Sequence, residues 1–325
     1  MILAAGLGTR LRPLTDTLPK PLVPVANRPI LEHTLALLAR AGVREAILNV
    51  HHLPDRMLEG LGSLDTSGVR LHTSLERRIL GTAGGLKKAE PFLAGGTFLL
   101  VNGDFLIDAD LSPVLDFHAR EGAAATMVLM PERERGVIGV DPDGTIARFI
   151  APRPAGEPRA RRSCGFTGIH VLEPEVFGLI PPGKPWEINL QVYPALIARG
   201  RKVCGFVHEG YWREAGSPAG YLAANLELVG GRAGDLRPRP GSGAGELPGA
   251  ACTGAVLAGD GVTVGRGVTV GPETVIGPEA RIGDGARIRR SVVLEGADVP
   301  DGADLDGEVV FPGGCFGREA TRAPA

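Results

Sequence analysis

"LAAGLGTRLRPLTDTLPKPLVPV" runs from Leu3 to Val25 and joins a short apolar start to a turn rich in glycine and positive charge. A strand that runs directly into glycines lets backbone N–H groups approach a phosphate, because Gly6 and Gly8 carry no Cβ. Up to residue 28 the only acid is Asp16, whereas the basic residues are Arg10, Arg12, Lys20 and Arg28. The stretch therefore predicts a binding site for an anion.

Outward from this stretch, as far as about Leu228, short β-rich apolar runs alternate with helical patterns. Strands are predicted over residues 46–50, 69–73, 98–102 and 126–130, and a helix over 30–41, with Asn27 as its N-cap and Gly42 as its stop. This alternation predicts an α/β layered domain with a mostly parallel sheet. Ligands of such sheets bind beyond the carboxyl ends of the strands.

The C-terminal part of the chain has a period of six residues. Apolar side chains recur six apart at Val264, Val270, Ile276, Ile282, Ile288 and Leu294, usually followed by glycine or a short polar residue. Each repeat of this kind buries its apolar face only by stacking on its neighbours. The repeats resemble the left-handed β-helices of hexapeptide-repeat proteins, with about three coils between Cys252 and Pro312. A loop-rich β-sandwich, the alternative, would not keep a strict period of six.

A segment without apolar periodicity separates the two patterns. Residues 230–250, "GGRAGDLRPRPGSGAGELPGA", contain seven Gly and three Pro, a composition typical of a linker. We therefore expect a first domain over residues 1–229, a linker over 230–250, a repeat domain over 251–314 and a tail over 315–325.

Composition excludes several classes of protein. The formal net charge of −2 over 325 residues argues against nucleic acid as a partner, so the ligand is expected to be small. The four cysteines lie far apart, without the spacing of a zinc site or a disulfide framework. No run of eighteen apolar residues and no signal-peptide pattern occurs, so we expect a soluble, cytoplasmic protein without a membrane segment.

Two common phosphate-binding motifs fail on the opening stretch. GxGxxG fails because Leu11 stands at the third glycine, and GxxxxGK[ST] fails because Arg12 and Pro13 follow. The stretch does resemble, residue by residue, the signature LAAGxGTRLxPLTxxxPKPLxPV of the sugar-1-phosphate nucleotidylyltransferases, a family that includes mannose-1-phosphate guanylyltransferases. The resemblance implies a Rossmann-like nucleotidyltransferase domain.

The same resemblance implies roles for individual residues. The turn would wrap the nucleotide phosphates through Leu3, Ala4, Ala5, Gly6, Gly8 and Thr9. Arg10 would face the departing pyrophosphate, and Lys20 would bind phosphate near the reacting centre. The alternative is that both cations are solvated surface residues beside a tight turn.

Two further segments match the family. "LGTAGGL", residues 80–86, leads into a helix predicted over 86–93 and resembles the base-recognition loop, which implies contacts from Leu80, Gly81, Thr82 and Gly85. Asp104 emerges at the end of the apolar strand in "FLLVNGDFLID", and the resemblance makes it a ligand of Mg²⁺, a cation that prefers carboxylates and phosphates. An entry to a helix and a turn-capping Asp are the structural alternatives.

The sequence departs from the family at two places. In "GYWREAGSPAG", Glu214 stands where the family's second carboxylate is usually Asp, and we expect it to be the second metal ligand. The family's Glu-Lys pair for the sugar phosphate is absent, because Ala151 and Pro152 occupy those positions. A substitute cation would come from Arg153, Arg159, Arg161 or Arg162, unless this run is a solvated loop. Thr167 and Gly168, in "GFTGIHVL", stand at expected sugar contacts.

The chemistry implied needs no general base. A phosphate monoester has a second pKa of about 6, so a sugar-1-phosphate is already ionised at neutral pH. The resemblance therefore predicts an enzyme that makes an NDP-sugar and pyrophosphate from an NTP, GTP first, and a hexose-1-phosphate, mannose-1-phosphate first. The alternatives are uridylyl or thymidylyl transfer to glucose-1-phosphate or an amino-sugar phosphate, and a regulatory homologue that binds without turnover.

The repeat domain is expected to be structural. Hexapeptide acyltransferases use a histidine in the β-helix, and no His follows His208. Exposed strand edges have unpaired backbone groups that can pair with another chain, so we expect a homo-oligomer formed through the β-helix.

Overall fold

The computed structural model describes residues 1–131, 138–148, 162–238 and 247–317. The chain forms two compact units. The first comprises residues 1–6, 34–103 and 109–210, and the second comprises 7–33, 104–108 and 211–325. The domain boundaries at residues 229, 250 and 314 stay predictions.

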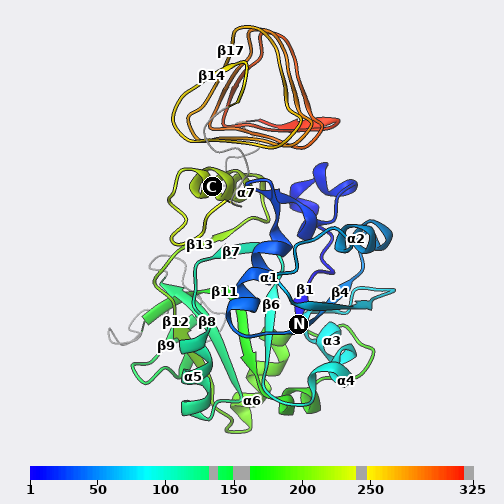
Figure 1. Cartoon of the computed structure of the whole chain (residues 1–325). Coiled ribbons are helices and arrows are strands. Elements are labelled where there is room, and N and C mark those ends of the chain that lie inside the picture. The colour runs from blue at the N-terminus through cyan, green and yellow to red at the C-terminus, as the bar shows by residue number, and fades with distance from the viewer. Residues whose placement is uncertain (132–137, 149–161, 239–246, 318–325) are drawn as a thin grey trace. The chain divides into compact units, whose positions relative to one another are not determined.

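Strand β1 (Ile2–Leu3) lies inside the first unit's sheet (Figure 1). It pairs in parallel with β4 (Glu45–Val50) and β6 (Phe98–Asn102), and β5 (Arg70–Leu75) extends this parallel half. In the other half β11 (Arg162–Leu172) runs antiparallel to β6, β8 (Ala125–Pro131) and β9 (Ile138–Val140), joined by β10 (Ile146–Arg148) and β12 (Val203–Val207). The predicted α/β fold is confirmed and the four predicted strands are present, and the sheet is mixed because β11 runs antiparallel to its neighbours.

The helices differ from the sequence predictions at two places. They are α1 (Ile30–Arg40), α2 (Pro54–Leu61), α3 (Gly81–Lys88), α4 (Glu90–Leu93), α5 (Ser112–Glu121), α6 (Tyr193–Ala198) and α7 (Pro218–Val229). The helix predicted over 86–93 is wrong, because α3 begins at Gly81 and Pro91, which has no N–H, lies in the first turn of a separate α4. Among the described residues, no helix is long and apolar enough to cross a bilayer.

Asn27 does not cap α1. It lies in the turn between β2 (Pro24–Val25) and β3 (Arg28–Pro29), where its φ is 57° and that of Ala26 is 50°. Two residues with positive φ suit a tight hairpin, and Asn adopts this conformation readily. The Asn27 side chain instead donates to the Ile276 carbonyl at 2.8 Å.

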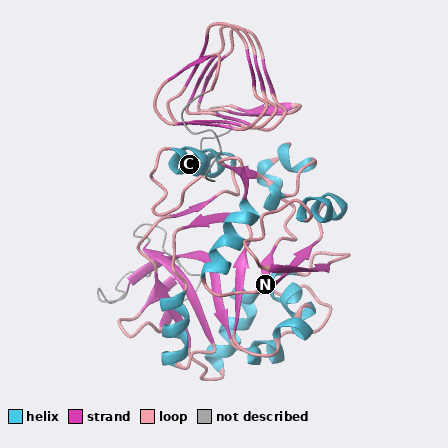
Figure 2. Cartoon of the chain, viewed as in Figure 1, coloured by secondary structure: helices cyan, strands magenta, loops and turns pink. Residues whose placement is uncertain are grey.

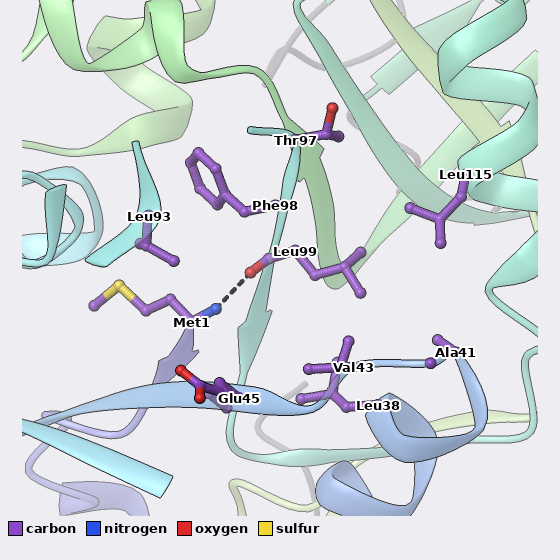
Figure 3. A pocket seen from close by; sticks show the side chains of 12 residues that line it. Met1, Leu38, Ala41, Val43, Glu45, Leu93, Thr97, Phe98, Leu99 and Leu115 are labelled. Carbon is purple, nitrogen blue, oxygen red and sulfur yellow. Dashed lines mark hydrogen bonds between the residues drawn. The ribbon is translucent and has the colours of Figure 1, made fainter. Parts of the chain in front are cut away.

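A pocket of about 250 Å³ lies beside the first strand (Figure 3). Its walls are mostly apolar and include Leu38, Leu93 and Leu115. The Met1 amino group is buried there and donates to the Leu99 carbonyl at 2.6 Å; this burial lowers the pKa of the amine to about 5. None of the predicted site residues lines this pocket, so the candidate chemistry lies elsewhere.

Two buried histidines predict a loss of stability in mild acid. Burial lowers the pKa of His170 to about 3, and burial followed by the charge of Arg28 lowers that of His33 to about 4. In the unfolded chain the two histidines bind protons below pH ~6.5, whereas in the folded protein they stay neutral until a lower pH. Their contribution to the free energy of unfolding is therefore complete above pH ~6.5 and is lost as the pH falls. We expect each histidine to remove about 1.4 kcal/mol per pH unit as the pH falls from 6.5 towards 4.

Urea unfolding at pH 7.0 and 5.0 measures this loss. A His170→Gln variant should show a shallower dependence on pH than the unchanged protein. Equal slopes for the two proteins would contradict the assignment.

The second unit begins with three short 3-10 turns that carry the basic residues: η1 (Thr9–Leu11), η2 (Leu14–Asp16) and η3 (Lys20–Leu22). Their apolar side chains, such as Leu11 and Leu14, share a buried core with Tyr221 of α7 and with Val275 of the repeat region. The turns are therefore held by packing on both α7 and the repeats.

The repeat region is a parallel β-helix, drawn as stacked triangular coils in Figure 1. Residues a coil apart lie side by side, as Ala250 beside Val268 and Thr269 beside Arg287. Figure 2 shows its short strands joined by loops. They form three sheets: β14 (Ala250–Cys252), β17 (Val268–Val270), β20 (Arg287–Arg289) and β23 (Asp304–Asp306); β15 (Val256–Ala258), β18 (Thr274–Ile276), β21 (Val292–Val293), β24 (Val309–Phe311) and an antiparallel β25 (Gly314–Phe316); and β16 (Thr263–Val264), β19 (Arg281–Ile282) and β22 (Asp298–Val299).

The predicted six-residue repeat is thus confirmed. The recurring residues from Val270 to Leu294 are buried in the coils. Arg–Asp pairs such as Arg266–Asp284 and Arg281–Asp298 link successive coils on the outside.

Candidate functional site

A two-stranded ribbon in the second unit brings the two predicted metal ligands together. Strand β7 (Phe105–Ile107) pairs antiparallel with β13 (Trp212–Glu214), and Glu214 lies opposite Phe105. The Ala215 N–H donates to the Asp104 carbonyl at 2.9 Å. Asp104 and Glu214 are therefore adjacent at one end of the ribbon, although 110 positions separate them in the sequence.

Each carboxylate is paired with one of the predicted phosphate-binding cations. Lys20 Nζ lies 2.6 Å from Asp104 Oδ2, with Lys20 12% exposed. Arg10 Nη2 donates to Glu214 Oε1, and this hydrogen bond is the main cause of the raised Arg10 pKa. The four side chains form a cluster with two positive and two negative charges.

Gly216 shows how closely these groups converge. A Cβ at this position would stand 2.5 Å from Lys20 Nζ, 2.8 Å from Glu214 Oε1 and 3.0 Å from Arg10 Nη2. Glycine therefore lets the three charged side chains approach the backbone here. We refer to Arg10, Lys20, Asp104 and Glu214 as the charge cluster.

The other two basic residues of the opening stretch have local partners. Arg12 pairs with Asp16, with both side chains about half exposed. Arg28 pairs with Glu32, which is buried. Arg10 and Lys20 are therefore the cations of this stretch that are held beside the predicted metal ligands.

The two glycines of the turn have different surroundings. Gly8 has φ +65° and a Cβ there would stand 3.0 Å from Thr15, whose hydroxyl donates to the Gly8 carbonyl at 2.8 Å. A Cβ on Gly6 would meet nothing within 4 Å. Gly8 is thus required by the shape of the turn, whereas the backbone at Gly6 faces open space that a ligand can enter.

In the first unit, the predicted base-recognition loop packs on residues 184–187. The Ala83 and Gly84 N–H groups both donate to the Trp186 carbonyl, and the Trp186 N–H donates to the Leu80 carbonyl at 2.9 Å. A Cβ on Gly84 would stand 2.5 Å from the Lys184 carbonyl. The glycines of this loop therefore allow one backbone to approach another.

The N-terminus of α3 is already occupied by a carboxylate of the chain. Glu187 Oε2 accepts from the Thr82 hydroxyl at 2.7 Å and from the Thr82 N–H at 3.3 Å. A helix N-terminus is a site for anions, and here Glu187 satisfies it. The loop over 80–85 is therefore suited to an uncharged part of a ligand rather than to a phosphate.

Asn49 and Glu76 join the two predicted nucleotide segments, and the sequence predictions missed both. Asn49 accepts from the Ala4 N–H, and Glu76 accepts from the Leu80 N–H. Both side chains are buried. For Asn49 the signal was a polar residue near the carboxyl end of an apolar strand, the same signal that pointed to Asp104. Glu76 follows β5, which is mostly polar, so this signal does not apply to it.

The two predicted sugar contacts lie in a bulge of β11. Its pairing with β8 shifts between Phe166 and Ile169, and Gly168 has φ +99°. The Thr167 hydroxyl is buried and donates to the Val128 carbonyl at 2.7 Å. In this conformation Thr167 completes the bulge, and its contact with a sugar stays a prediction.

The arginines proposed in place of the Glu-Lys pair are divided by the described ranges. Arg153, Arg159 and Arg161, with Ala151 and Pro152, lie outside the described residues. Arg162 is described, and its guanidinium pairs with Glu209 at the surface.

Comparison with known proteins adds two family matches. Residues 1–230 match the family described as "Nucleotidyl transferase", and residues 252–313 match the "GMPPB C-terminal domain". The chain is 33% identical over 275 residues to "Mannose-1-phosphate guanylyltransferase" of Mycobacterium tuberculosis, covering 81% of this chain and 76% of that protein.

The names of two other relatives give two different activities. "UTP--glucose-1-phosphate uridylyltransferase" of Synechocystis is 34% identical over 69% of this chain, and "Mannose-1-phosphate guanyltransferase" of Candida albicans is 37% identical over 69%. The matched region spans only 61% and 62% of these two proteins. The structure of HddC from Yersinia pseudotuberculosis complexed with GMP-PN matches 70% of this chain and 97% of that chain with a TM-score of 0.59 at 22% identity, which indicates a shared fold.

Proposed function

Because this chain belongs to the nucleotidyl transferase family, we propose that it transfers a nucleotidyl group from an NTP to a sugar-1-phosphate and releases pyrophosphate. The observation that carries the proposal is the charge cluster. Two cations held beside two carboxylates, and packed against the backbone at Gly216, suit a metal-bound triphosphate.

The cations would act on the departing pyrophosphate. In the cluster each cation contacts one carboxylate, and the remaining N–H groups of Lys20 and Arg10 are available to contact phosphate oxygens. Charge that develops on the leaving group is stabilised best by groups already held in place, and Lys20 is held by its buried neighbours Pro21 and Leu22. The sugar phosphate needs no base, so positioning and charge neutralisation account for the reaction.

Asp104 and Glu214 are the proposed ligands of Mg²⁺. Two carboxylates together with phosphate oxygens and water are the donor set that this ion prefers. The missing Cβ at Gly216 lets Glu214, Lys20 and Arg10 approach one another there. A bound Mg²⁺ would neutralise negative charge on the triphosphate. The remaining contacts are proposed to come from Leu3 to Gly6 and from Gly8 and Thr9 for the phosphates, and from the loop over 80–85 for the base.

GTP and mannose-1-phosphate are the proposed substrates. The match of residues 252–313 to the "GMPPB C-terminal domain" and the names of the mycobacterial and fungal relatives support this pair. The Synechocystis relative makes UTP with glucose-1-phosphate the second candidate, since its identity is similar.

A substrate panel tests the proposal. Pyrophosphate release is measured for GTP, UTP, dTTP and ATP, each with mannose-1-phosphate, glucose-1-phosphate and glucosamine-1-phosphate. We expect the highest kcat/KM for GTP with mannose-1-phosphate. Nucleotide binding by calorimetry without pyrophosphate from any pair would instead identify a binding homologue without turnover.

We further propose a homo-oligomer formed through the β-helix. Strands β14 and β16 lie at the edges of their sheets, and unpaired edge groups favour pairing with another chain. Light scattering coupled to gel filtration should give a mass that is a multiple of 33.9 kDa. A mass of one chain at every concentration would exclude this assembly.

A cytoplasmic location is proposed as well. The four cysteines, all within the described residues, form no disulfide, which fits a reducing compartment. Cell fractionation would test it, and recovery of the protein outside the cytosol would contradict it.

A further inference from the structure

Four groups of the first unit form one unbroken chain of hydrogen bonds. Asn49 Oδ1 accepts from the Ala4 N–H at 2.7 Å, and Asn49 Nδ2 donates to Glu76 Oε1 at 2.8 Å. Glu76 Oε2 in turn accepts from the Leu80 N–H at 3.1 Å. The chain therefore runs from the glycine-rich turn to the loop over 80–85, and we call it the Asn49 relay.

The relay is buried throughout its length. Asn49 is 3% exposed and Glu76 is 2% exposed. A buried hydrogen bond in low dielectric is strong, and loss of one partner leaves the other unsatisfied. The two loops are therefore tied together more firmly than surface contacts would tie them.

The amide side chain of Asn49 completes the relay because it carries both an acceptor and a donor. It must accept on one side, from Ala4, and donate on the other, to the Glu76 carboxylate. An aspartate would place a second carboxylate against Glu76, and a leucine would leave both neighbours unpaired. Gly85 leaves room for this pair, because a Cβ there would stand 2.6 Å from Glu76 Oε1 and 2.9 Å from Asn49 Nδ2.

We propose that Asn49 is a positioning residue that couples the two nucleotide-binding segments. The inference rests on the proposed function. A base held at residues 80–85 restrains Leu80 and Glu76, and through Asn49 it restrains the Ala4 amide and the turn that follows it. A phosphate ligand of the turn then loses less conformational freedom on binding, which is positive cooperativity between the two fragments.

Fragment binding tests the coupling directly. The probes are pyrophosphate with Mg²⁺ and guanosine, or the nucleoside of whichever triphosphate the substrate panel selects. Calorimetry gives the Kd of pyrophosphate with and without saturating nucleoside. In the unchanged protein we expect the nucleoside to tighten pyrophosphate binding about fivefold or more, and to slow hydrogen exchange at the Ala4 amide.

Two matched variants isolate the relay. Asn49→Asp keeps the acceptor for Ala4 and replaces the donor to Glu76 by oxygen. Asn225→Asp makes the same exchange at a fully buried amide that accepts from the Ala26 N–H at 2.8 Å and donates to the Tyr221 carbonyl at 2.9 Å. We expect Asn49→Asp to bind both fragments with a coupling factor near one, and Asn225→Asp to keep the coupling.

The outcomes separate this inference from the proposed function. If neither fragment binds the unchanged protein, the proposed function fails. If both bind independently, or if Asn49→Asp keeps the fivefold effect, the inference is overturned while the function stands. Should Asn49→Asp not fold, Glu76→Gln interrupts the same chain by placing an NH₂ group against a donor, and retained coupling in that variant overturns the inference equally.

Discussion

Replacing Lys20 by methionine should lower kcat for pyrophosphate release by about 10²–10³ and leave the melting temperature nearly unchanged. Methionine keeps most of the buried stem but removes the charge that would stabilise the departing pyrophosphate, and loss of one such preorganised donor has an effect of this size. The fold should survive, since Asp104, the partner left behind, is 27% exposed and can be solvated.

Arg12→Ala is the control for Lys20→Met. Arg12 lies in the same basic stretch, but its guanidinium pairs with Asp16 at the surface and is 52% exposed. Surface pairs of this kind contribute roughly 0–1 kcal/mol, so we expect activity within twofold of the unchanged protein. Steady-state kinetics on both variants decide the point, and full activity in Lys20→Met would remove Lys20 from the proposed machinery.

Gly216→Ala should lower kcat/KM by about tenfold to a hundredfold, although it adds a single methyl group. The new Cβ would overlap Lys20 Nζ and Glu214 Oε1, and displacement of reacting groups by about 1 Å costs this much. Both atoms are the ends of flexible side chains that can move aside, and Gly216 does not have a positive φ. The melting temperature should therefore change little while activity falls.

Gly178→Ala is the matched control for this change. A Cβ at Gly178 would meet nothing within 4 Å, and its φ is also not positive. We expect unchanged kinetics and stability that is equal or slightly higher, because alanine restricts the unfolded chain. If Gly216→Ala and Gly178→Ala have the same kcat/KM, the activity does not depend on the positions of the charge-cluster side chains at Gly216.

The features that the sequence predicted well are those that depend on local pattern. The six-residue period from Val264 to Leu294 could be recognised because every repeat meets the same stacking requirement. The same apolar position therefore recurs in each repeat. Strand β6 was predicted at its observed bounds, since its apolar run ends at Asn102 and Gly103, at the carboxyl end of the strand.

The features that it missed depend on partners distant in sequence. Gly85 was predicted to contact the base, but the structure shows a second reason for glycine there, the approach of Asn49 and Glu76. Glu187 occupies the N-terminus of α3 from 105 positions away. Asn is a common N-cap residue, but the conformation of Asn27 is determined by the hairpin and by its hydrogen bond to the Ile276 carbonyl of the β-helix. No local pattern carries such contacts.

Within the site, residue types were easier to predict than pairings. The sequence predicted two cations and two carboxylates, but it did not predict that Lys20 pairs with Asp104 and Arg10 with Glu214. The antiparallel register of β7 with β13 brings the two carboxylates together from segments more than a hundred residues apart. The turns η1 and η3 bring Arg10 and Lys20 to them.

The central claim is that the charge cluster holds a metal-bound triphosphate, and a crystal soaked with Mn²⁺ and a non-hydrolysable GTP analogue tests it most directly. The account predicts an anomalous manganese peak within coordinating distance of Asp104 and Glu214, with phosphate oxygens in hydrogen-bond contact with Lys20 and Arg10. A bound analogue whose phosphates and manganese lie away from these four side chains, with both ion pairs still closed, would contradict it.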